Sequence, residues 1–186
     1  MAKSARLPSE YQEVKYIKTH TSGKYDGNSP KSFICTNIPN DTISKVIVKY
    51  GVISFPGLRK SMILASHANG NTTALEPYIT VDGTSSGGLT LSPTISSPYD
   101  GKTEVYTVTY PANASYNLRI GGWTDVAWTA EGAYYSVDVY DTNNGLLAQF
   151  APCYRKSDNK AGMYEIIGGA FYPSNGTMDF IAGANV

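Results

Sequence analysis

Carboxylates are the first residues with which this sequence could do chemistry. Hydrolysis of a glycosidic bond needs two carboxyl groups about 5 to 10 Å apart, and on one strand that means acids two or four residues apart. Asp138 and Asp141 are three residues apart and would point to opposite faces, whereas Glu104 and Glu131 are isolated. A pair contributed by distant strands stays open, but no residue favours it, so we expect no enzymatic activity.

Histidines and nucleophiles form no catalytic pattern either. His20 and His67 lie outside any recognisable nucleophile elbow. His67 follows an apolar run, and we interpret it as a polar residue at a strand end. Neither GxxxxGK(S/T) nor GxGxxG occurs, so nucleotide binding has no basis.

Residues that could hold a metal ion are sparse. Cys35 and Cys153 are too few and too far apart for a zinc site, and we interpret them as buried thiols, with one long-range disulfide as the alternative. Asp26-Gly27-Asn28 resembles a piece of a calcium loop but lacks the later acidic ligands that six or more oxygen donors require. We interpret this segment as a turn and expect neither a metal nor a cofactor.

Aromatic side chains are the remaining candidates for a binding function. Trp123 and Trp128 lie in a stretch that follows two glycines, which indicates a loop, and Tyr134 comes soon after. Exposed Trp and Tyr stack on sugar faces and anchor interfaces. These three residues are therefore the predicted ligand-binding residues, and the alternative for the tryptophans is that at least one of them plugs the end of the fold.

Strands must carry these residues, because polar and apolar residues alternate with period two. Over residues 45–52 three valines and Tyr50 fall on one face and two lysines on the other, and residues 104–110 and 135–139 alternate in the same way. This pattern is typical of half-buried antiparallel strands. Residues 62–65 form a continuous apolar run, which suits a central strand covered on both faces.

Short turns separate these runs and define the architecture. Asp-Gly, Asn-Gly and Gly-Gly pairs recur along the chain and tolerate the positive φ of tight hairpins. Many short strands with such spacing indicate a two-sheet antiparallel β-sandwich. With no linker or repeat, we expect an N-terminal arm over residues 1–6 and one sandwich domain over residues 7–186.

Composition and charge exclude several partner classes. Fifteen basic residues offset fifteen acidic ones, and neither sign forms a long block, so we expect no nucleic-acid partner. No apolar run is long enough to span a membrane, so we expect no membrane insertion. The start MAKSARLPSEYQ lacks the apolar core of a signal peptide, which favours synthesis in the cytoplasm.

Two segments resemble a known family. Residues 7–17 read LPSEYQEVKYI, and residues 135–183 read YSVDVYDTNNGLLAQFAPCYRKSDNKAGMYEIIGGAFYPSNGTMDFIAG. Both are similar to the opening and closing patterns of concanavalin A-like/laminin-G-like domains in phage structural proteins and gut-bacterial surface proteins. The resemblance implies a jelly-roll sandwich whose terminal segments lie close together. We interpret the aromatic residues of the closing segment as packing residues.

The resemblance also implies a function. We expect a non-enzymatic structural protein of a phage particle, capsid- or tail-associated, located in the virion after synthesis in the host cytoplasm. Its expected partners are other virion proteins or copies of itself, with host or mucosal glycans as further ligands. The alternative is a carbohydrate-binding adhesin module of a bacterial surface, and a glycoside hydrolase is a weaker alternative.

The period-two alternation makes a first testable prediction. The far-ultraviolet circular-dichroism spectrum should be that of β structure, because most apolar residues alternate with the period of a strand rather than that of a helix. A spectrum dominated by helix would contradict the predicted fold.

Overall fold

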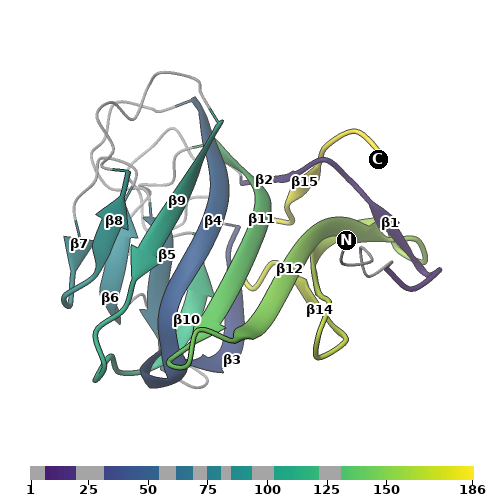
Figure 1. The fold of residues 1–186 in the computed structure, drawn as a ribbon. Coiled ribbons are helices and arrows are strands. Elements are labelled where there is room, and N and C mark those ends of the chain that lie inside the picture. The colour runs from purple at the N-terminus through teal and green to yellow at the C-terminus, as the bar shows by residue number, and fades with distance from the viewer. Residues whose placement is uncertain are drawn as a thin grey trace.

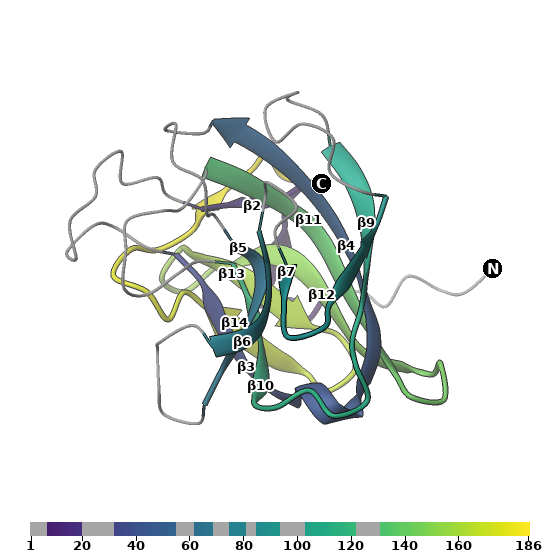
Figure 2. The same ribbon diagram turned by 90° about the vertical axis from the view of Figure 1, so that its left-hand side faces the viewer.

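The protein is an all-β sandwich of two stacked antiparallel sheets. The computed structural model describes residues 7–19, 32–54, 62–68, 75–80, 85–93, 103–121 and 131–186. Figures 1 and 2 show the two sheets packed face to face. In these residues there is no α-helix, and hence no helix that could cross a membrane. The fold class predicted from the sequence is confirmed.

The larger sheet has the strand order β14-β13-β12-β11-β4-β9-β8 in the described residues, with three short strands attached beside this path. The bounds of the main strands are β4 (Ile43–Ser54), β8 (Thr90–Ser92), β9 (Thr103–Thr109), β11 (Glu131–Asp141), β12 (Leu146–Arg155), β13 (Lys160–Glu165) and β14 (Ala170–Pro173). The attached strands are β1 (Tyr11–Glu13), β2 (Ile17–Lys18) and β15 (Ile181–Ala182).

The smaller sheet covers the inner face of the larger one and has the order β3-β10-β5-β6-β7. Its strands are β3 (Ile34–Pro39), β5 (Met62–His67), β6 (Leu75–Thr80), β7 (Ser85–Ser86) and β10 (Asn117–Ile120), and a short 3-10 helix, η1 (Asn40–Thr42), leads from β3 into β4. The run 62–65 lies in β5 between β10 and β6, as expected of a central strand.

The core lies between the two sheets and follows the predicted alternation. Val46, Val48 and Tyr50 of β4 are buried, while Lys49 between them is exposed on the outer face. Leu64 of the small sheet is also fully buried in the same cluster. Burying one such aliphatic side chain stabilises the fold by about 1.5–3 kcal/mol, so the cluster holds the two sheets together.

A β-bulge changes the alternation in β11. Tyr134 pairs with Tyr50 and Ser136 with Lys49, so Tyr135 is an extra residue in the register. The sequence predicts that Tyr135 shares a face with Val137, but the bulge places Tyr134 in the core instead and leaves Tyr135 half-buried. A period-two pattern cannot reveal where a strand gains one residue.

Pro152 lies inside the large sheet, although prolines in sheets are usually confined to edge strands. β12 pairs with β13 on one side, and on the other side it pairs with β11 up to Phe150 and with β1 from Cys153 onward. The carbonyl of Pro152 accepts a hydrogen bond from the N–H of Val14, 3.1 Å away, so the nitrogen of Pro152 faces this junction. A residue without an N–H is tolerated there because the neighbouring strand changes.

The two terminal segments lie side by side, as the resemblance implied. β2 pairs with β15, and the N–H of Lys15 donates to the carbonyl of Ala184 at 2.8 Å. Figure 1 shows β1, β2 and β15 together at one end of the large sheet. The predicted arm, residues 1–6, lies outside the described residues.

Hairpin turns are confirmed at Asn144-Gly145 and Gly168-Gly169, which join paired strands. The pairs Gly87-Gly88 and Asn175-Gly176 instead connect strands that do not pair with each other. Between β11 and β12 the Asp141 carboxylate accepts the N–H groups of Asn143 and Gly145, each at 2.8 Å, and Asn144 has φ 64°. A positive φ favours Asn and Gly, which explains the Asn-Gly pair. The turn before β14 has Gly169 at φ 75°.

The contact between Gly132 and Tyr50 yields a stability prediction. A Cβ on Gly132 would overlap the hydroxyl and ring of Tyr50, which is buried and cannot swing into solvent. Gly132→Ala should therefore lower the free energy of unfolding by about 1–3 kcal/mol, measured by denaturant unfolding. Tyr50→Leu removes the overlapping atoms, so the double variant should lose less than the sum of the two single losses; strict additivity would contradict the proposed overlap.

Candidate functional site

The residues that the sequence singled out for binding do not form a described site. Trp123 and Trp128 lie outside the described residues, as do His20 and residues 26–28. Tyr134 is 1% exposed, and its hydroxyl donates to the carbonyl of Ile63 at 2.9 Å. This bond joins the two sheets, so Tyr134 is a core residue with no ring face open to a ligand, which corrects the expectation of an exposed tyrosine.

A cluster of aromatic rings lies instead on the outer face of the large sheet. The ring of Tyr11 lies 4.8 Å from that of Tyr164 and 5.2 Å from that of Phe171, measured between centroids. The three side chains come from β1, β13 and β14 and are each half-buried. We call Tyr11, Tyr164 and Phe171 the aromatic platform.

Gly162 allows the platform to lie close to the sheet. It lies on the outer face of β13. Cys153 of β12 pairs with it on one side, and Pro173 of β14 pairs with it on the other. A Cβ at Gly162 would lie 2.9 Å from two carbons of the Phe171 ring and would overlap the carbonyl of Tyr172. The Phe171 ring therefore packs directly over the glycine backbone.

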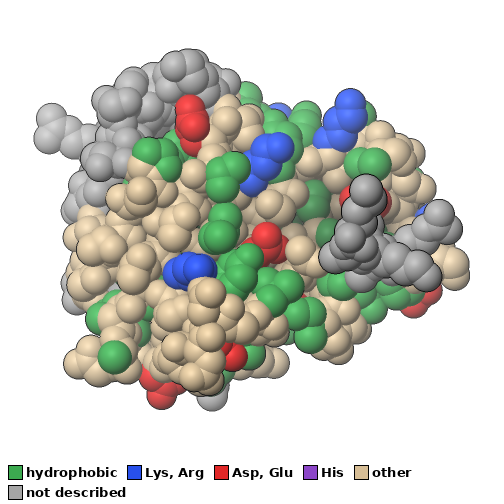
Figure 3. All heavy atoms as spheres, viewed as in Figure 1, with side chains coloured by type: hydrophobic (Ala, Val, Ile, Leu, Met, Phe, Trp, Pro, Cys, Tyr) green, Lys and Arg blue, Asp and Glu red, His purple; other side chains and the backbone are tan. Residues whose placement is uncertain are grey.

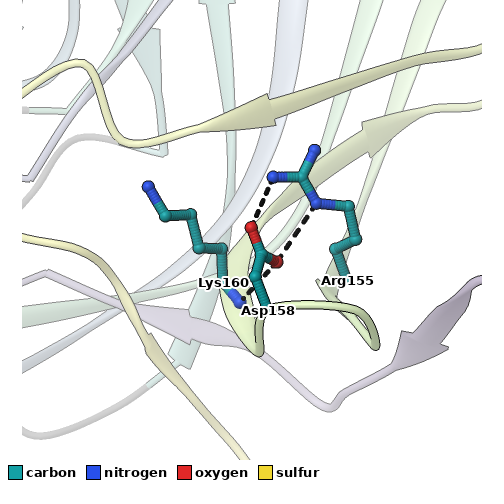
Figure 4. A network of polar contacts seen from close by, with 3 residues as sticks. All are labelled: Arg155, Asp158 and Lys160. Carbon is teal, nitrogen blue, oxygen red and sulfur yellow. Dashed lines mark hydrogen bonds and ion pairs between the residues drawn. The ribbon is translucent and has the colours of Figure 1, made fainter.

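Arg155 brings charged groups to one side of the platform, and Figure 4 shows its contact with Asp158 beside Lys160. The guanidinium of Arg155 lies 5.2 Å from the centroid of Phe171, and its Nε and Nη2 donate to Asp158 at 3.1 and 2.6 Å. The backbone N–H of Lys160 donates to the same carboxylate at 3.2 Å. The hydrogen bond from Arg155 is the main reason that the pKa of Asp158 falls to about 2, and it also raises the pKa of Arg155.

This arrangement is suited to stacking and hydrogen bonding. Aromatic rings offer an apolar face with a negative quadrupole, and a guanidinium held by two bonds presents its remaining N–H groups in a defined direction. Sequence reasoning missed the platform because it interpreted all closing aromatics as packing residues. The signal was the Gly168–Gly169 hairpin, whose register sets Tyr164 opposite Phe171.

Further aromatic residues lie on the outer face around β4 and β11. The ammonium of Lys45 lies 4.8 Å from the ring centroid of Tyr140, and that of Lys49 lies 5.5 Å from the centroid of Tyr135. The ring of Tyr16 packs 5.4 Å from Tyr135. Figure 3 shows hydrophobic side chains across this face among single charged groups of both signs, so neither sign gathers into a block there.

A pocket of about 330 Å³ opens between the edges of the two sheets. It lies where the end of β3 and η1 face the start of β12, the end of β13 and β14. Its walls are mostly apolar, and among the described residues that line it Glu165 has the one charged side chain. The carboxylate of Glu165 accepts the N–H groups of Gln149 at 3.3 Å and Ile167 at 2.8 Å, and also that of Gly168.

The other chemically active side chains have structural positions. His67 ends β5, as predicted, and its Nε2 lies 2.8 Å from the carbonyl oxygen of Thr36. Cys35 and Cys153 are free thiols, so the disulfide alternative is wrong for this structure. Within the described ranges, no three His, Cys, Asp or Glu side chains are grouped as they would be around a metal ion.

Comparisons with protein-family models, with curated proteins and with solved structures found no match to this chain.

Cys153 is buried as expected, whereas Cys35 is only half-buried, and the burial of Cys153 makes a prediction about its reactivity. Desolvation raises the pKa of Cys153 to about 12 and also raises that of Cys35. Because the thiolate is the nucleophile, Cys153 in the folded protein should react with iodoacetamide at pH 8 at least about a hundredfold more slowly than in denaturant. Peptide mass spectrometry of timed samples would measure this, and equal rates in both conditions would contradict the burial of the thiol.

Proposed function

We propose that this chain is a non-enzymatic structural protein of a phage particle, and that its sandwich binds surface glycans through the aromatic platform. The observation that carries the glycan-binding part is the set of three half-buried rings with Arg155 and Asp158 at their border. The sequence resemblance to concanavalin A-like/laminin-G-like domains of phage structural proteins supports the virion part.

The chemistry of a sugar fits the platform. One face of a pyranose ring carries C–H groups that pack on aromatic rings, while its rim carries hydroxyls that need hydrogen-bond partners. Phe171 and Tyr164 would offer the ring faces, and the guanidinium of Arg155 would offer donors beside them. Because Asp158 already orients this guanidinium, less side-chain entropy is lost when a ligand binds.

The state of the acidic groups near these sites supports binding rather than catalysis. Asp158 is engaged by Arg155, and the depressed pKa of its carboxyl makes it a weak base. Glu165 accepts two backbone N–H groups of its own turn and one of β12. Each carboxylate therefore performs a structural task in the described fold.

Substitution of Tyr11 tests the glycan-binding part. Tyr11→Ala removes one ring of the platform and should weaken binding to glycans on an array by about tenfold or more, which corresponds to about 1.4 kcal/mol. Tyr116→Ala is the matched control, because Tyr116 is 48% exposed in the segment between β9 and β10 and belongs to no platform contact. Equal binding by both variants, or no glycan binding by the unmodified protein, would rule out the platform as a glycan site.

A separate measurement tests the virion part. Mass spectrometry of purified phage particles should find this chain at a defined copy number after washing in high salt. Glycan binding without retention on particles would instead favour the bacterial adhesin.

A further inference from the structure

The pocket between the sheet edges is separate from the aromatic platform. Neighbouring residues of a strand point to opposite faces, so Phe171 lies on the platform while Tyr172 lines the pocket. The ring of Tyr172 is held in place by an edge-to-face contact with Phe150, whose centroid is 5.6 Å away. A ligand in the pocket would therefore contact a surface that the glycan proposal does not use.

Glu165 gives the pocket a fixed negative charge. Its side chain is 7% exposed, and the three N–H donors hold both carboxylate oxygens in place. Oε1 accepts two of these bonds and Oε2 accepts one, so Oε2 keeps one of the roughly four acceptor positions of a carboxylate. Within the described part of the chain, the hydrogen bonds that the Glu165 carboxylate accepts come from backbone N–H groups.

The negative charge also acts on the neighbouring tyrosine. Desolvation, and then the charge of Glu165, raise the pKa of Tyr172. Both Glu165 and Tyr172 line the pocket. The remaining walls are apolar and include Ile38, Pro39 and Leu147.

These features select a ligand by exclusion. An anion would be repelled by Glu165, and an apolar side chain would cover the carboxylate with hydrocarbon and give it no partner, which costs free energy. A guanidinium binds carboxylates best through two parallel bonds, but Oε1 is already occupied. A lysine side chain matches both parts, because its hydrocarbon stem packs on apolar walls while its ammonium is a compact charge that needs one acceptor.

We propose that this pocket binds the side chain of a lysine from a partner protein, with the ammonium on Glu165 Oε2 and the stem against Ile38, Pro39 and Leu147. The pocket of about 330 Å³ is large enough for one such side chain. The expected partner protein therefore presents a protruding lysine on its surface. This assignment does not depend on glycan binding by the platform.

Nuclear magnetic resonance of the isotope-labelled full chain tests the proposal with a defined probe. Titration with capped lysine, N-acetyl-lysine methylamide, should shift the amide signals of Leu147, Ile167 and Gly168 to saturation. The same compound acetylated on Nε keeps the stem but loses the charge, so it should bind at least about tenfold more weakly. No saturable shift with capped lysine, or equal affinity for the acetylated probe, would overturn the proposal.

Variants distinguish the effect of the charge of Glu165 in the pocket from the effect of negative charge elsewhere on the surface. Glu165→Gln should reduce the affinity for capped lysine by at least about tenfold, whereas Asp41→Asn, an exposed acid of η1 that does not line the pocket, should leave it unchanged. If Glu165→Gln disturbs the hairpin, Thr42→Lys at the exposed rim provides the second test. Its tethered ammonium should compete with the probe, while Thr42→Met should not.

Equal losses of affinity for capped lysine in Asp41→Asn and Glu165→Gln would overturn the proposed site. Tighter binding of glucosamine than of capped lysine, measured from the same amide signals, would also overturn it. Because the Tyr11→Ala test reports on the other face of β14, failure here and failure of glycan binding are distinguishable.

Discussion

The exchange of neighbours along β12 is the constraint on which this end of the molecule depends. β12 pairs first with β11 and then with β1, and Pro152 lies where the neighbour changes. A proline cannot donate to a ladder, so this position favours a break in the pairing. The break admits β1, which carries Tyr11 to the outer face beside β13 and β14. Without it the aromatic platform would lack the ring contributed by the N-terminal segment.

β14 connects the two proposed sites through the geometry of a strand. Because successive side chains alternate between faces, Phe171 contributes to the platform and Tyr172 to the pocket. The hairpin that leads into β14 is held by Glu165, whose carboxylate accepts three N–H groups from its own turn and from β12. The same carboxylate charges the pocket, so the group that forms the hairpin also determines which ligands the pocket excludes.

Structural features set by interactions between near neighbours in sequence could be predicted, whereas features set by distant residues could not. The sandwich, the hairpin at Asn144 and the burial of Val46 and Val48 were predictable, because alternation and turn chemistry act between near neighbours in sequence. The bulge at Tyr135 was not predictable, because it depends on how β11 fits β4. The expectation of an exposed Tyr134 failed for the same reason, since its hydroxyl bonds to a strand of the other sheet.

By itself, the sequence determined the all-β class, the hairpin turns at Asn144-Gly145 and Gly168-Gly169 and the balance of charge, because these depend on local conformation and composition. Only the tertiary structure decided which surfaces could bind. Tyr11 packs near Tyr164 and Phe171, and Ile38 lines the same pocket as Leu147 and Glu165, although these residues are far apart in the sequence and no local rule connects them. Such sites arise from strand order and register, which are set by the packing of the whole core.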